Sequence, residues 1–138
     1  MGDKKGVVAI LGLGQVGSIL AAHLYREGVS IAAVDLPDRV EQVKEEGLWV
    51  NSGEDIHIHP HYLYSSIHSL AQHDELRAIL ITTKTSALEE VGPELVEVVQ
   101  DDLPVISLQN GIGTEQTLLR FLPARNVARG IVNFASNL

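Results

Sequence analysis

The feature that most constrains the fold is a short apolar run, Val7 to Leu11, that leads directly into a glycine-rich turn. The run is rich in β-branched residues, which is typical of a buried parallel strand. Apolar residues recur at helical spacing after the turn, through Leu24. We therefore expect a strand, a tight turn and a helix in succession. The turn itself carries the motif Gly12-Leu13-Gly14-Gln15-Val16-Gly17.

A G-x-G-x-x-G motif between a strand and a helix indicates dinucleotide binding, because each glycine has a physical role there. Gly12 permits the tight turn, Gly14 lets the backbone approach a pyrophosphate, and Gly17 lets the helix pack closely on the strand. The N–H groups and positive dipole end at the start of the helix would then face the anion. The alternative is a glycine-rich turn in an ordinary α/β protein. We expect cofactor contacts from Gly12, Leu13, Gly14, Gln15, Val16 and Gly17.

The next strand, expected at 30–34, ends at Asp35. An acid about 20 residues after the motif is placed to accept hydrogen bonds from the adenosine ribose hydroxyls. A carboxylate would repel a 2′-phosphate, so Asp35 favours NAD over NADP. Arg39 follows a few residues later and could reach such a phosphate, which leaves the preference open. The alternative for Asp35 is a solvated acid at a strand end.

Strands and helices are expected to alternate along the remaining chain. Strands are expected at 48–50, 56–59, 77–83, 104–108 and 127–134, and helices at 37–46, 66–73, from Ser86 onward and at 114–121. Gly92-Pro93 is expected to kink the helix after Ser86 or divide it in two. The pattern predicts a doubly wound, mainly parallel sheet with helices on both faces, an α/β fold of the Rossmann type. Residues 1–138 are expected to form a single dinucleotide-binding domain.

Composition excludes several classes of function. The chain has 138 residues and a net charge of −8, and it contains no basic cluster, which argues against a nucleic-acid partner. Its apolar runs are shorter than the ~18 residues that a membrane helix needs, so a membrane partner is not expected. The absence of cysteine removes disulfides and thiolate metal sites. We expect a cytoplasmic protein.

Three histidines alternate along and just after one expected strand: His57, His59 and His61. Alternation puts side chains on one face, where imidazoles can bind a metal ion. Pro60 disturbs the strand, and no cysteine or paired carboxylate completes a ligand set. We expect a solvated polar face and no metal site.

Three segments follow predicted strands: the Gly12 turn, Thr82-Thr83-Lys84, and the stretch from Gln109 to Glu115. Ligands of open α/β sheets bind along the carboxyl ends of the strands, so the three segments should face one crevice. Their sequences ILGLGQVG, ITTKTSALEEV and ISLQNGIGTE, in this order and spacing, resemble the N-terminal half of ketopantoate reductases (2-dehydropantoate 2-reductases). The resemblance spans nearly the whole chain, and QNGIGTE is its most specific part.

The resemblance implies hydride transfer from a nicotinamide dinucleotide to a small 2-oxoacid, with ketopantoate as the leading substrate. It implies that Lys84 and Asn110 lie beside the nicotinamide and the substrate as catalytic residues, and that Thr83, Lys84 and Asn110 contact the cofactor. NADPH is usual in the family, but Asp35 stands where members that prefer NADPH carry a basic residue. The cofactor is therefore NAD or NADP, with NAD favoured.

The helical domain that brings the catalytic lysine and a substrate-binding glutamate in this family has no counterpart in residues 1–138. We expect a domain-sized part of a two-domain enzyme that is catalytically incomplete alone and whose uncovered apolar surface favours self-association, for example as a homodimer. Two alternatives stay open. One is a non-catalytic dinucleotide-binding module with a regulatory or redox-sensing role. The other is the cofactor domain of an opine-type or other ketone reductase.

Overall fold

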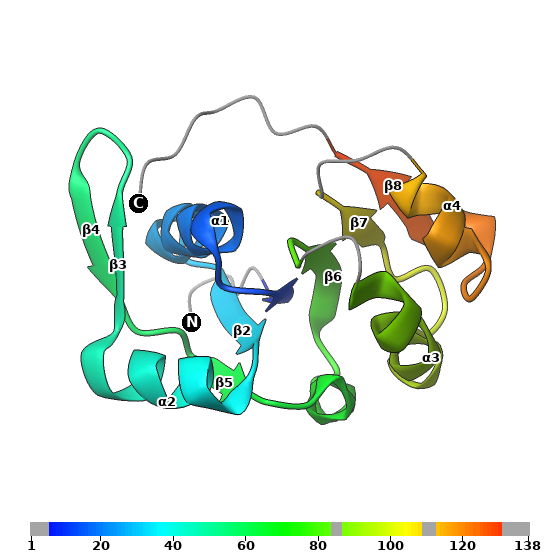
Figure 1. Cartoon of the computed structure of the whole chain (residues 1–138), viewed down its shortest axis with the longest axis horizontal. Helices are drawn as coiled ribbons and strands as arrows, with labels where there is room; N and C mark the ends of the chain where they lie inside the picture. Colours follow the sequence, from blue (N-terminus) through cyan, green and yellow to red (C-terminus); the bar gives the residue numbers. More distant parts are fainter. Residues whose placement is uncertain (1–5, 84–86, 109–112, 131–138) are drawn as a thin grey trace.

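The computed structural model describes residues 6–83, 87–108 and 113–130. Its main sheet has six strands, all parallel, in the order β5-β2-β1-β6-β7-β8 (Figure 1). A separate antiparallel hairpin consists of β3 and β4. The strands are β1 (Val7–Leu11), β2 (Ser30–Val34), β3 (Leu48–Asn51), β4 (Asp55–Ile58), β5 (Tyr62–Tyr64), β6 (Leu76–Ile81), β7 (Val105–Ser107) and β8 (Val127–Arg129). The helices are α1 (Gln15–Arg26), α2 (Pro37–Glu46), α3 (Leu88–Val98) and α4 (Thr114–Leu119), with 3₁₀ turns η1 (Ile67–Gln72) and η3 (Ala124–Asn126).

The strand order confirms the predicted fold class. Counted without the hairpin, the order is 3-2-1-4-5-6, which is that of the doubly wound dinucleotide-binding fold. The order reverses between β1 and β6, so the crevice of such a fold opens at the carboxyl ends of these two strands. This is the edge at which the glycine turn leaves β1.

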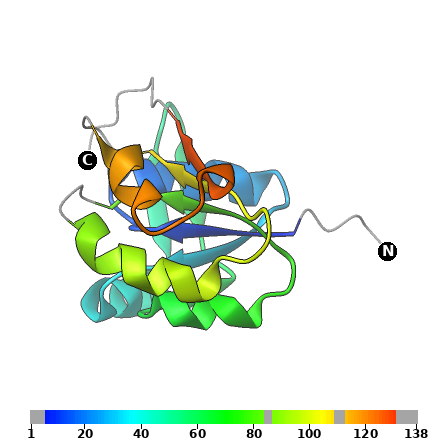
Figure 2. The ribbon, with the colours of Figure 1, turned by 90° about the vertical axis from the view of Figure 1, so that its right-hand side faces the viewer.

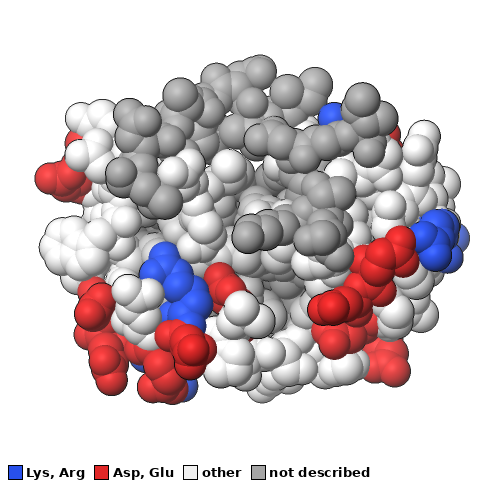
Figure 3. Space-filling model, viewed as in Figure 1, with Lys and Arg blue, Asp and Glu red and all other residues white. Residues whose placement is uncertain are grey.

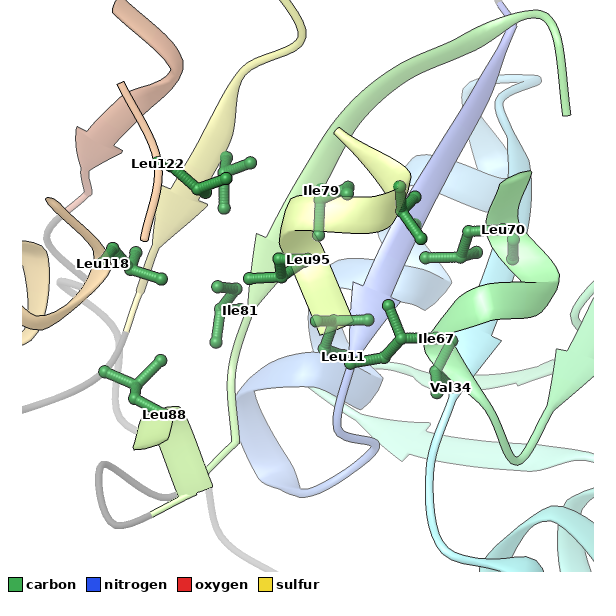
Figure 4. Close-up of a cluster of buried hydrophobic side chains, with 14 of the residues drawn as sticks. Leu11, Val34, Ile67, Leu70, Ile79, Ile81, Leu88, Leu95, Leu118 and Leu122 are labelled. Carbon is green, nitrogen blue, oxygen red and sulfur yellow. The ribbon is translucent and has the colours of Figure 1, made fainter. Parts of the chain in front are cut away.

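Two apolar cores lie on opposite faces of the sheet, and Figure 2 shows α1 and α3 on opposite sides of the strands. On one face, Ile79 and Ile81 pack against η1, α3 and α4, and Figure 4 shows this cluster. On the other face, Ile10 and Ile31 pack against α1, the buried Val43 of α2 and the inner side of the hairpin. Two covered faces explain why the central strands are almost continuously apolar.

The structure corrects three details of the expected elements. β5 was not anticipated, because three residues just after Pro60 form no apolar run. Gly92-Pro93 does not divide its helix in two: α3 continues through Pro93 to Val98. Strands expected to extend to Thr83 and Leu108 end two and one residues earlier. Ser86, expected as a helix cap, and the end of the last expected strand lie outside the described residues.

The hairpin packs its apolar side on α1 and turns its other side outward. Trp49 and His57 are paired across β3 and β4, and their rings stack at 3.8 Å between centroids and 6° between planes. His57 Nε2 also lies 2.8 Å from the carbonyl of Glu46. At the tip, an ion pair between Arg26 and Glu54 joins the hairpin to the end of α1. These contacts hold Trp49, the single tryptophan, in a defined position although 67% of it is exposed.

Candidate functional site

The glycine turn is held tightly against β2 and β6. Gly12 has a φ of 103°, a left-handed conformation that favours glycine, and its N–H donates to the carbonyl of Val34 at 2.9 Å. The hydroxyl of Thr82 donates to the carbonyls of Gly12, at 2.7 Å, and Leu11, at 3.0 Å. Thr82 was not among the predicted site residues. Its signal in the sequence is a hydroxyl at the end of the strand next to the glycine turn.

Gly17 is where α1 approaches the turn most closely. A Cβ at Gly17 would lie 1.9 Å from the carbonyl oxygen of Gly12 and 2.6 Å from the Thr82 hydroxyl. Real Cβ atoms essentially never come within 3.0 Å of another heavy atom in this way. Only a glycine therefore lets the first turn of α1 pack against the end of β1.

Gly14 has the opposite surroundings. It is exposed, it stands at the N-cap of α1, and an added Cβ would have nothing within 4 Å. The first turn of α1 contains no acidic residue that would repel an anion. The first N–H groups of a helix have no partner within the helix and carry the positive end of its dipole. The opening of α1 is thus both accessible and suited to a phosphate group.

Asp35 links the glycine turn to the end of β2. One carboxylate oxygen, Oδ2, accepts from Leu13 N at 2.8 Å, and the other, Oδ1, accepts from Leu36 N at 2.7 Å. The residue is half-buried. Each carboxylate oxygen keeps further acceptor capacity beyond one N–H, so Asp35 remains able to accept hydroxyl hydrogen bonds.

Arg39 lies beside the same turn. Its Nη2 donates to the carbonyl of Leu13 at 3.1 Å, and its Nη1 donates to Gln42 Oε1 at 2.8 Å. The hydroxyl of Ser18 also donates to the Leu13 carbonyl, at 3.1 Å. The N–H group of Leu13 is therefore held by Asp35, directly after β2, and its C=O group by Arg39, in the first turn of α2.

A cavity of about 490 Å³ lies between the opening of α1 and the hairpin. Buried Leu13 and Val50 contribute apolar surface, whereas Arg39 and Asp55 are charged and Trp49 adds an aromatic ring. Figure 3 shows this side of the molecule, where acidic atoms lie below and beside a group of basic atoms near α2. The remaining lining residues are Gly14, Gln15, Ser18, Ile19 and Asn51.

The other predicted site residues divide into two groups. Gln15 and Val16 are half-buried in the first turn of α1, and Thr83 is half-buried with its backbone 3.1 Å from the position of a Cβ on Gly12. The turn, Asp35 and Thr83 thus meet at the carboxyl ends of β1, β2 and β6. Lys84 and Asn110 lie outside the described residues.

The histidines take part in contacts that the sequence did not reveal. Besides the stacking of His57 on Trp49, His61 Nδ1 accepts from the backbone N–H of Ile31 at 3.0 Å. Over residues 6–83, 87–108 and 113–130, no three His, Asp or Glu side chains gather as they would around a metal ion. Within those same ranges, no helix has the length and apolar character to span a membrane.

Comparison with known proteins places this chain in a family. Residues 8–138 match the family model described as ketopantoate reductase PanE/ApbA. The chain is 28% identical to the 2-dehydropantoate 2-reductase of Lactococcus lactis over 95% of its residues, and 29% identical to that of Nostoc over 99%. It covers 42% and 41% of these two relatives, so it spans about two-fifths of their length.

Solved structures agree. The 2-dehydropantoate 2-reductase of Geobacter metallireducens superposes with a TM-score of 0.83 at 25% identity, over 96% of this chain and 43% of that one. A D-mandelate dehydrogenase solved with NADH and anilino(oxo)acetate superposes with a TM-score of 0.75 at 26% identity, over 91% and 40% of the two chains. Together with the family match over almost its entire length, these similarities show that the chain belongs to the ketopantoate reductase PanE/ApbA family.

Proposed function

We propose that this chain binds NAD(P)H and is the cofactor-binding part of a 2-dehydropantoate 2-reductase. The observation that carries the proposal is the contrast between the glycines of one turn. Gly12 and Gly17 are packed against protein atoms, whereas Gly14 is open at the positive end of α1. A turn that served packing alone would not need a glycine at position 14, where a side chain would meet no other atom. The backbone at Gly14, Gln15 and Val16 would hold the diphosphate.

The chain's own residues would then order the rest of the cofactor. Asp35, fixed by two backbone N–H groups, would accept the hydroxyls of the adenosine ribose, and its charge favours NADH over NADPH. Thr83 borders the turn on the side of β6. When bound, the reduced nicotinamide would supply a hydride to the keto carbon of a 2-oxoacid.

Lys84 and Asn110 are proposed to act on the substrate. The carbonyl oxygen of a ketone gains negative charge as its carbon is reduced, and a lysine ammonium stabilises that charge. The amide of Asn110 offers both donor and acceptor groups for orienting the substrate or the nicotinamide ribose. The product would be a 2-hydroxyacid, with ketopantoate giving pantoate. We place the reaction in the cytoplasm.

A second substrate is favoured by one comparison. The similarity to a D-mandelate dehydrogenase, at 26% identity, suggests an aromatic 2-oxoacid in place of ketopantoate. Both substrates share the carboxylate and the adjacent ketone, so the cofactor half can serve either. A dinucleotide-binding module without chemistry of its own is the remaining alternative.

Trp49 offers a direct test, because it is the single tryptophan and borders the cavity beside the turn. NADH should quench its fluorescence and accept its excitation energy in a saturable titration, with a dissociation constant below about 1 mM. Ketopantoate or benzoylformate is then added, and NADH oxidation is followed. We expect binding with little turnover, since the chain spans about two-fifths of its relatives. A chain that binds neither NADH nor NADPH would refute the proposal.

A further inference from the structure

Arg39 occupies an unusual position for a basic residue next to a ribose-binding acid. It stands four residues after Asp35, and both side chains contact the backbone of Leu13. A guanidinium binds phosphate through a planar fork of N–H donors, and phosphate is what distinguishes NADP from NAD at the adenosine ribose. Arg39 is thus the group within this site that could reverse the preference set by Asp35.

Both terminal nitrogens of Arg39 are already engaged. Nη2 donates to the carbonyl of Leu13 at 3.1 Å in a partly buried contact, and Nη1 donates to Gln42 Oε1 at 2.8 Å in an exposed one. Each of these nitrogens keeps a second N–H, but the two contacts together fix the orientation of the guanidinium. Turning it toward a phosphate would require the release of Leu13 or Gln42. Because the Leu13 contact is partly buried and also helps to hold the glycine turn, the contact with Gln42 is the easier one to give up.

We propose that Arg39 is a specificity-determining residue for the choice between NADH and NADPH, and that Gln42 holds it in the position that selects NADH. This inference rests on the proposed function of the glycine turn. While Gln42 and Leu13 hold the guanidinium, the Asp35 carboxylate faces the adenosine ribose without the guanidinium beside it, and its negative charge disfavours a 2′-phosphate. Release of Nη1 from Gln42 lets the guanidinium face the phosphate and offset that repulsion.

Gln42 permits a test that leaves the cofactor contacts untouched. It is exposed on α2, and alanine and glutamate are both good helix formers, so Gln42→Ala and Gln42→Glu should fold. NADH and NADPH are titrated against each variant through Trp49 fluorescence, and the ratio of the two dissociation constants is compared. Urea unfolding checks that each variant is folded.

Gln42→Ala should shift the ratio toward NADPH by about threefold to tenfold, the effect of one hydrogen bond to a charged group near the surface. The affinity for NADH should change by less than about twofold, since Gln42 does not touch the turn. Gln42→Glu replaces the amide by a carboxylate and should shift the ratio toward NADH, because it holds the guanidinium more strongly.

An Arg39→Met background separates this mechanism from a general effect of charge. In that background, Gln42→Ala should leave the ratio unchanged, because there is no guanidinium to release. An unchanged ratio for Gln42→Ala alone, or the same shift with and without Arg39, overturns the inference and leaves Arg39 as a brace for Leu13. A wild-type chain that binds neither nucleotide refutes the proposed function first, and this inference with it.

Discussion

Replacing Gly17 by alanine should weaken both the fold and the candidate site. The new Cβ would lie 1.9 Å from the carbonyl oxygen of Gly12, whereas ordinary contacts begin at about 3.4 Å, so α1 must withdraw by about 1.5 Å. Overpacking of this kind costs about 3 kcal/mol. Displacement of the Thr82 hydroxyl, 2.6 Å from the same Cβ, would remove its hydrogen bond to Gly12 and cost about 1 kcal/mol more.

Alanine also returns about 1 kcal/mol, because it is a better helix former than glycine. The free energy of unfolding should therefore fall by about 2–4 kcal/mol, measured as a lower urea midpoint at an unchanged slope. Gly14→Ala is the matched control, since its Cβ meets nothing within 4 Å. It should cost at most about 1 kcal/mol of stability. Its methyl group would occupy the space of the diphosphate, so affinity for NADH should fall by about tenfold or more.

The two variants separate packing from binding. If Gly17→Ala unfolds at the same urea midpoint as the wild type, the inference that α1 packs too closely on Gly12 to admit a Cβ is refuted. If Gly14→Ala binds NADH like the wild type, the diphosphate does not lie at the opening of α1, whatever its effect on stability.

Three further predictions concern single side chains. Asp35→Asn should weaken NADH binding, and it should raise the affinity for NADPH relative to that for NADH, since an amide does not repel a phosphate. An unchanged ratio of the two dissociation constants would count against the contact between Asp35 and the ribose. Asn126→Ala should cost about 2–3 kcal/mol in urea unfolding, because buried Asn126 donates to the carbonyls of Asp101 and Leu103, each at 2.9 Å. Burial raises the pKa of Tyr64 above its ordinary value of 10.0. Stability from this group is complete below pH 10.0 and is lost as pH rises through the folded-state pKa, a decline that Tyr64→Phe should lack.

The sequence predicted the part of the fold in which local pattern and tertiary packing agree. β1, the glycine turn and α1 follow directly from an apolar run, a G-x-G-x-x-G motif and helical periodicity. Gly47 ends α2 where it was expected to. β5 could not be predicted, because its pairing with β2 is set by distant backbone and not by its own three residues.

Within the candidate site, residue types were easier to predict than contacts. Asp35 was identified from its spacing, but its two bonds to backbone N–H groups depend on how the turn after β1 meets the turn after β2. Arg39 was considered only as a phosphate ligand, and its bonds to Leu13 and Gln42 became visible only in three dimensions. The alternative of two short helices at Gly92-Pro93 was wrong, because a proline removes one hydrogen bond from a helix and the packing of α3 on the sheet outweighs that loss.

The central position of β1 has a consequence for the folding kinetics of the chain. β1 pairs with β2 on one side and with β6 on the other. The pairing of β1 with β6 joins Val8 to Ala78, which lies far along the chain, so it can form only after the intervening segment has closed. Parallel pairing across such a long loop raises contact order, and we expect refolding in about milliseconds to seconds. Until that loop closes, one edge of β1 stays exposed and can pair with another chain, so refolding yield should fall as protein concentration rises.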